Sequence, residues 1–172
     1  MDFDTWSQKG NKGGGYADVL PYFKKCEQKI GAGDETYRGR DGNLKINDLD
    51  WRDPLCDAFI QGANSIGIPS NTDYNGAKQE GVSYVQRTTH KRLRVSAAKA
   101  FLNPAKSRPN LRIITNALAT KIILDGKRAV GVLYKKGIKD AHTLQLKANK
   151  EVILSGGAIN SPQLLQLSGI VP

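Results

Sequence analysis

The residue types best suited to chemistry lie in the stretch 155–162, Ser-Gly-Gly-Ala-Ile-Asn-Ser-Pro. The apolar run 152–154 before it predicts a buried strand, and Ser161 and Pro162 are typical of a helix N-cap and first turn. Glycines let a ligand approach closely, and a helix N-terminus attracts a phosphate or a polarised oxygen. A plain strand–helix connection that binds nothing is equally compatible with these residues.

Other residue types that carry chemistry are sparse. His90 lies in a basic turn and His142 at a predicted strand edge, and neither has a neighbouring partner suited to catalysis or metal binding. We therefore expect no catalytic residue and no metal site in this chain. Tyr84 and Phe101 are predicted to be core residues. Cys26 and Cys56 lack metal-type spacing and are interpreted as reduced thiols.

Length and composition indicate a globular chain. It has 172 residues, of which 39% are hydrophobic, enough for one domain with a core. No apolar run approaches the roughly 20 residues of a membrane span. The first residues, MDFDTW, are acidic and aromatic, unlike a signal peptide. We expect a cytoplasmic protein without an integral membrane segment.

The formal charge of +10 is concentrated, because no acidic residue occurs between Glu80 and Asp125. Such a block could be an electrostatic footprint for nucleic acid or a solvated face. Only Tyr84 and Phe101 are aromatic there, too few for a base-stacking surface, so we expect no nucleic-acid binding. The basic residues of this window include Arg87, Lys91, Arg92, Arg94, Lys99, Lys106, Arg108, Arg112 and Lys121.

Periodicity predicts a mixed fold of the α+β or α/β class. Helical spacing predicts helices at 16–27, 54–66 and 96–101. The first should begin near Val19 or Leu20, because Pro21 belongs in a first turn. Asp53 is the expected cap before Pro54. The first fifteen residues are predicted to be weakly structured. Alternation predicts strands at 44–47, 82–88, 111–115, 120–124, 129–134, 143–148 and 150–154, the middle ones forming an antiparallel meander around an Asp-Gly turn at 125–128.

Three stretches, in order, resemble one enzyme family. GAINSPQLLQLSGI at 157–170 closely resembles the second signature of the glucose–methanol–choline (GMC) oxidoreductases, which are FAD-dependent alcohol oxidases and dehydrogenases. MDFDTWSQKGNKGGGYADVLPYFKKCE at 1–27 is similar to the family segment that leads into the substrate-side domain. KRLRVSAAKAFLNPAKSRPNLRIITNA at 91–117 resembles the segment that returns to the flavin domain.

The resemblance implies a choline dehydrogenase-like protein that uses FAD to oxidise a small-molecule alcohol. It implies that 1–108 mainly belong to the substrate-side domain and 109–172 to the FAD-binding domain, with its meander and strand–glycine–helix unit. By the same resemblance, the flavin contacts fall on Ala119, Ser155, Gly156, Gly157 and Ala158.

Two parts that the family carries are missing from this sequence. No strand–GxGxxG–helix unit occurs, since no strand pattern precedes Gly13-Gly14-Gly15, and no catalytic His–His or His–Asn pair follows the second signature. We therefore interpret the chain as a central piece of a GMC protein, inactive alone, whose partners include the missing parts of that protein. The alternative is a non-catalytic interaction module derived from the GMC fold. Val171 stands where the family usually has Gly, which predicts an altered turn after the helix.

Overall fold

The structure is a computed structural model that describes residues 2–137 and 142–170. It is a mixed α/β chain that divides into two compact units, Met1–Leu111 and Arg112–Pro172. The turn expected to be altered at Val171 lies outside the described residues. Which unit belongs to the substrate side and which to the flavin side stays a prediction.

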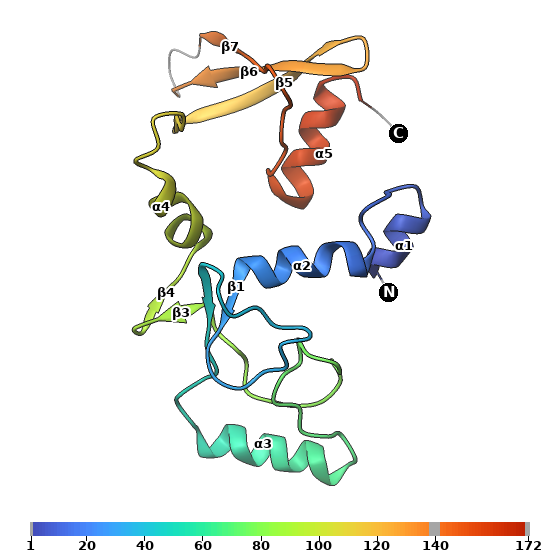
Figure 1. Cartoon of the computed structure of the whole chain (residues 1–172), viewed down its shortest axis with the longest axis vertical. Helices are drawn as coiled ribbons and strands as arrows, with labels where there is room; N and C mark the ends of the chain where they lie inside the picture. Colours follow the sequence, from blue (N-terminus) through green and yellow to red (C-terminus); the bar gives the residue numbers. More distant parts are fainter. Residues whose placement is uncertain (1, 138–141, 171–172) are drawn as a thin grey trace. The chain divides into compact units, whose positions relative to one another are not determined.

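Two helices begin the first unit, α1 (Asp2–Gln8) and α2 (Tyr16–Cys26) (Figure 1). The prediction of weak structure before residue 16 is wrong, because α1 forms there. Its Phe3 ring packs edge-on against the rings of Trp6 and Phe23, with centroids 5.6 and 5.7 Å apart. The predicted start of α2 near Val19 is also wrong. Asp18 Oδ2 accepts the Gly15 N–H at 3.1 Å and thereby stabilises an earlier start, with Pro21 inside the helix.

A short parallel pair follows. β1 (Glu27–Lys29) pairs with β2 (Leu44–Ile46), and residues 30–43 cross between them. After β2 the chain forms α3 (Pro54–Ser65), the predicted second helix. Asp53 Oδ1 accepts the Leu55 N–H at 2.8 Å, so the expected cap is confirmed.

The rest of the first unit is irregular between short elements. The hairpin β3 (Thr89–His90) and β4 (Leu93–Arg94) precedes a π-helical turn, η1 (Ala98–Leu102), and α4 (Asn103–Ala105). The strands predicted at 82–88 and 111–115 do not form. Within the described residues 82–88 make only two isolated bridges, Ser70↔Val82 and Asn47↔Arg87. Alternation alone cannot make a strand where no neighbouring strand supplies the ladder.

The second unit contains the predicted meander. β5 (Ala117–Asp125), β6 (Arg128–Lys136) and β7 (Thr143–Lys147) form an antiparallel sheet in the order β5-β6-β7 (Figure 1). The chain then enters α5 (Gly157–Leu167). Residues 150–154 form no strand in the described unit, and Ile153 is 77% exposed. The predicted buried strand is therefore wrong for this chain, because no described strand lies beside it.

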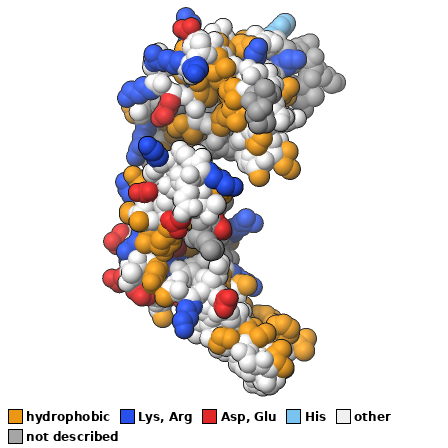
Figure 2. Space-filling model, turned by 90° about the vertical axis from the view of Figure 1, so that its right-hand side faces the viewer, with side chains coloured by type: hydrophobic (Ala, Val, Ile, Leu, Met, Phe, Trp, Pro, Cys, Tyr) orange, Lys and Arg blue, Asp and Glu red, His pale blue; other side chains and the backbone are white. Residues whose placement is uncertain are grey.

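The chain buries little apolar surface. Its accessible area is 13,631 Å², whereas a compact protein of 18.8 kDa exposes about 8,300 Å² and two separate units of that total mass about 10,000 Å². Of the described apolar side chains, only Val95, Ala100 and Ile122 are classed as buried. Figure 2 shows hydrophobic side chains gathered over α3 at the bottom of the view, where Leu55 and Phe59 are 79% and 72% exposed.

Candidate functional site

The glycine turn at the start of α5 presents backbone donors to solvent. Residues 155–158 are exposed, and Gly157 has φ +87°, a conformation that favours glycine. The predicted N-cap at Ser161 is wrong, because α5 begins at Gly157, four residues before it. From inside the helix, Ser161 Oγ accepts the Gly156 N–H at 2.9 Å. The first turn contains no acidic residue, so it suits an anion or a polarised oxygen.

Ala119 lies in β5, opposite Tyr134 on β6, and is exposed. A register irregularity separates Ala119 from Lys121, so one extra residue enters the edge strand at this point. At its far end α5 is tied to β5, because Ser168 Oγ accepts the Ile122 N–H at 2.8 Å and donates to the Leu164 carbonyl at 2.6 Å. Ala119 and the glycine turn thus belong to one unit, on elements joined by Ser168.

The chemistry of these residues is compatible with one end of an FAD molecule. A Cβ placed on Gly157 would meet no atom within 4 Å, so the space in front of the turn is open. The exposed position of Ala119 on the edge strand suits the approach of a planar ring. The donors are neutral amides without an adjacent carboxylate in the helix's first turn, which suits an anionic cofactor.

The first unit has an open cleft of about 590 Å³, lined by residues including Gly33, Asp48, Arg52, Asp73 and Tyr84. The Tyr84 hydroxyl accepts the Asp53 N–H at 3.1 Å and lies 2.9 Å from Asp57 Oδ1, to which it can donate. Arg52 lies 4.3 Å from the centre of the Tyr84 ring. Partial burial raises the pKa of Tyr84, and Asp57 raises it further. Tyr84 therefore stabilises the start of α3, which is a structural role.

A buried arginine organises the loop between β1 and β2. Arg38 is 1% exposed and donates from Nε to Glu27 Oε1 at 2.7 Å and from Nη1 to Gln86 Oε1 at 3.0 Å. Nη1 also pairs with Asp73. Burial lowers the pKa of Arg38, but Glu27 and Asp73 outweigh it and raise the pKa above its ordinary value. Gln86, like Tyr84, has a structural role here.

Two further cations stabilise the same loop. Lys29 is 2% exposed and its ammonium lies 2.8 Å from both carboxylate oxygens of Asp48. Arg40 donates to the carbonyl groups of Lys29, Gly31 and Gly33 at 2.7–2.9 Å. Sequence analysis missed the buried Lys29 and Arg38 and the half-buried Arg40, because Lys and Arg in a glycine-rich polar stretch are usually solvated. The available signal was the close spacing of Arg38 and Arg40 in a stretch with four glycines, at positions 31, 33, 39 and 42.

The comparisons with known proteins decide the family. The family model for GMC oxidoreductase matches residues 1–172, the whole chain. The chain belongs to the GMC oxidoreductase family. It is similar to an oxygen-dependent choline dehydrogenase of Brucella anthropi, with 46% identity over 99% of this chain, and to one of Sinorhizobium fredii, with 45% identity over the same share.

Solved structures agree with this assignment. An FAD-dependent oxidoreductase from Chaetomium thermophilum superposes with a TM-score of 0.88 at 30% identity, over 98% of this chain and 31% of that one. A pyridoxine 4-oxidase from Mesorbium loti gives 0.85 at 30% identity, over 98% and 33%. The chain spans about 30% of the length of the curated GMC relatives it matches.

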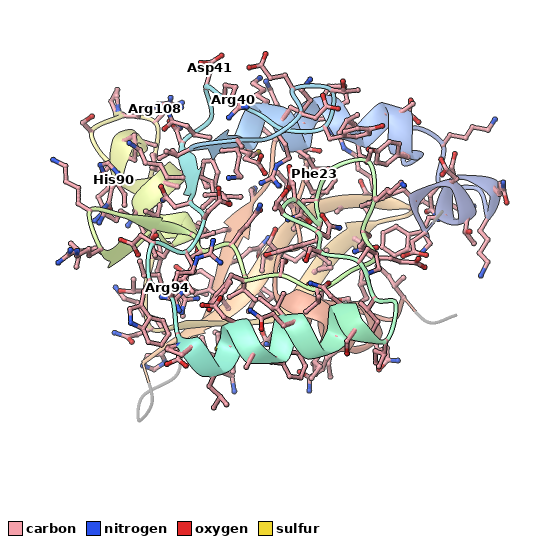
Figure 3. All side chains as sticks on the ribbon, turned by 90° about the horizontal axis from the view of Figure 1, so that it is seen from below. Phe23, Arg40, Asp41, His90, Arg94 and Arg108 are labelled. Atoms are coloured by element: carbon pink, nitrogen blue, oxygen red, sulfur yellow. The ribbon has the colours of Figure 1, made fainter. Side chains whose placement is uncertain are left out.

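Catalytic groups of the GMC kind are sparse in this chain. His90 lies on β3 of the hairpin that also carries Arg94 (Figure 3), and partial burial together with Lys45, Lys91 and Lys99 lowers the pKa of His90 below 6.5. His142 is exposed in the other unit. Within the described ranges no group of three or more His, Cys, Asp or Glu could hold a metal, and no described helix is long and apolar enough to cross a bilayer.

Proposed function

We propose that this chain supplies the adenine side of an FAD site and part of the substrate-side domain of an FAD-dependent alcohol oxidoreductase. The observation that carries the proposal is the match of the whole chain to the GMC family, combined with coverage of about a third of an FAD-dependent relative. Further GMC segments complete the enzyme. When bound, FAD accepts the hydride that leaves the alcohol carbon.

The second unit would hold the cofactor. The backbone N–H groups at the start of α5 would face polar groups of the dinucleotide, and Gly157 leaves room for close approach. Ala119 would contact the adenine through its backbone. Ser155 and Ala158 flank the glycines and complete the contact residues that we propose.

The first unit would contribute to the substrate side. Choline and pyridoxine, which appear in the names of two relatives, both carry primary alcohol groups. We propose a small primary alcohol as the substrate of the completed enzyme. The proton acceptor for the hydroxyl would come from a segment outside this chain, because His90 lies among basic residues and His142 is exposed in the other unit.

A titration with FAD tests the cofactor part of the proposal. We expect the purified chain to bind FAD, seen as quenching of flavin fluorescence. Ala158→Glu puts a negative charge in the first turn of α5 and should weaken binding about tenfold, or 1.4 kcal/mol. The matched variant Gln166→Glu adds the same charge in the last turn and should change the affinity by less than about twofold. Equal effects of the two variants would contradict the placement of the cofactor at the first turn of α5.

A turnover assay tests whether this chain needs further GMC segments to oxidise an alcohol. The chain with FAD and choline or pyridoxine under anaerobic conditions should leave the visible absorbance of oxidised flavin unchanged. Bleaching of the flavin by either alcohol would show that this chain alone carries the chemistry.

A further inference from the structure

One face of the β5–β6–β7 sheet carries lysines and apolar side chains that take no part in the proposed flavin site. We propose that this face docks a protein partner that carries an acidic patch. We call it the lysine face. It consists of Leu118, Lys121, Ile123, Gly131, Leu133, Lys135, Thr143, Gln145 and Lys147.

The register of the three strands defines this face. Lys121 lies opposite Leu133, which lies opposite Gln145, and directly opposed residues share a side of the sheet. Ile123, Gly131 and Lys147 form the next row, and Leu118, Lys135 and Thr143 form the third. Each row therefore contributes one lysine. A Cβ on Gly131 would lie 3.2 Å from the end of the Ile123 side chain, which confirms that these two positions share the face.

The opposite side of the sheet has a different role. It carries the row Ile122, Val132 and Leu146, and Ile122 is 3% exposed. Ala119 pairs with Tyr134, which alternates with Leu133 along β6 and so points away from the lysine face. A partner on the lysine face would leave the proposed adenine position free, so this inference does not depend on the proposed function.

The charge of the unit is unbalanced. Its described residues include eight Lys or Arg and two acids, Asp125 and Glu151, a net of +6. The lysine face itself carries three cations and no carboxylate, and no described acid forms an ion pair with Lys121, Lys135 or Lys147. Lys and Arg side chains gather at the top of Figure 2, over the elements of this unit.

Protection of the sheet edges explains only part of this pattern. Lysines on edge strands prevent the association of sheets, and β5 and β7 are the edges. Lys135, however, lies on β6, the central strand, whose hydrogen-bonding groups are already shared with two neighbours. Its partners across the strands are Leu118 and Thr143, where a glutamate would have stabilised it.

The chemistry of the face favours an acidic protein over other anions. Leu133 lies at the centre of the face beside Lys121. Leu118, which is 68% exposed, and Ile123 lie at its β5 edge, so the face mixes apolar side chains with lysines, as protein–protein interfaces do. The face has no Arg and no aromatic side chain, which nucleic-acid surfaces use for bidentate contacts and base stacking. Three lysines alone would supply about 3 kcal/mol at an anionic membrane, too little for stable attachment.

Binding of a defined acidic probe tests the proposal. We would measure fluorescence anisotropy of labelled poly-L-glutamate with the full chain over a range of salt concentrations. Lys121→Gln, Lys135→Gln and Lys147→Gln combined should weaken binding about tenfold or more and flatten the salt dependence. The single variant Lys135→Glu, on the central strand, should weaken it about tenfold while circular dichroism shows an unchanged fold.

A matched control separates the face from net charge. Lys9→Gln, Lys12→Gln and Lys78→Gln remove the same charge from exposed positions of the other unit and should change the affinity by less than about twofold. Equal losses in the two triple variants would overturn the proposal, because binding would then follow net charge. Stronger, lysine-face-dependent binding to phosphatidylglycerol vesicles or to single-stranded DNA would also overturn it, in favour of a lipid or nucleic-acid partner.

Discussion

At the scale of single residues, Gly39 lies where no side chain fits. A Cβ at this position would lie 1.9 Å from the Lys24 carbonyl oxygen and 2.7 Å from that of Glu27. We expect Gly39→Ala to destabilise the first unit by about 3 kcal/mol or more, because backbone atoms must move. Urea denaturation followed by circular dichroism would measure this.

Gly62 provides the matched control. It lies inside α3, and a Cβ there would meet no atom within 4 Å. Gly62→Ala should raise the free energy of unfolding by about 1 kcal/mol, because alanine favours the helix. Equal stability of the two alanine variants would contradict the close contact of Gly39 with the carbonyl groups of Lys24 and Glu27.

His90 makes the stability of the first unit depend on pH. The folded state lowers its pKa below 6.5 through partial burial and through Lys45, Lys91 and Lys99, so the unfolded state binds the proton more tightly. Stability therefore falls as the pH drops through 6.5 and on to the folded pKa. Thermal unfolding midpoints of wild type should decline across that window, and His90→Gln should reduce the decline. An equal decline in wild type and His90→Gln would contradict this assignment.

At the scale of elements, one hydroxyl joins α5 to β5. Ser168 is 7% exposed, and its Oγ accepts the Ile122 N–H. Ser168→Ala leaves this buried amide without an acceptor, which should cost about 1–3 kcal/mol. Hydrogen exchange at the Ile122 amide should accelerate accordingly.

An exposed serine serves as the comparison. Ser65 Oγ donates to the Gly62 carbonyl on the surface of α3. Ser65→Ala should change stability by less than about 0.5 kcal/mol, because water replaces the lost bond. A Ser168→Ala variant as stable as Ser65→Ala would show that the α5–β5 contact does not depend on this hydroxyl.

Elements whose signals are local could be predicted from the sequence. The Asp53 cap with Pro54 marks the start of α3, and Asp125 and Gly126 mark the β5–β6 turn. The start of α5 could not be predicted, because Ser161 lies inside the helix and its Oγ accepts the N–H of Gly156, five residues earlier in the chain. Residues 152–154 carry a strand pattern without a described strand beside them, so local pattern and observed structure differ there.

At the scale of the whole molecule, the exposed area has a calorimetric consequence. The chain exposes about 3,600 Å² more than two compact units of its mass. Less surface is therefore released on unfolding. We expect a heat-capacity change below the about 2.1–2.6 kcal/mol/K that is ordinary for 172 residues. Scanning calorimetry measures it, and a value inside the ordinary range would show that the chain becomes more compact in solution.

The candidate flavin site illustrates which part of a site can be predicted from one chain. The resemblance supplied Ala119 and residues 155–158, and the structure places them in one unit on elements joined through Ser168. Neither Ser168 nor Arg38 was predicted as a connecting residue. Both act through contacts with residues more than ten positions away, which no local pattern encodes.

The crossover between β1 and β2 bears on the order of folding. Parallel strands cannot pair until the chain between them has turned back, and here residues 30–43 contain no helix to guide that turn. Arg40 instead ties the carbonyl groups of residues 29, 31 and 33, while Arg38 ties Glu27 to Asp73. The contacts of these two guanidinium groups therefore offset part of the entropy lost when the loop at 30–43 closes and β1 pairs with β2.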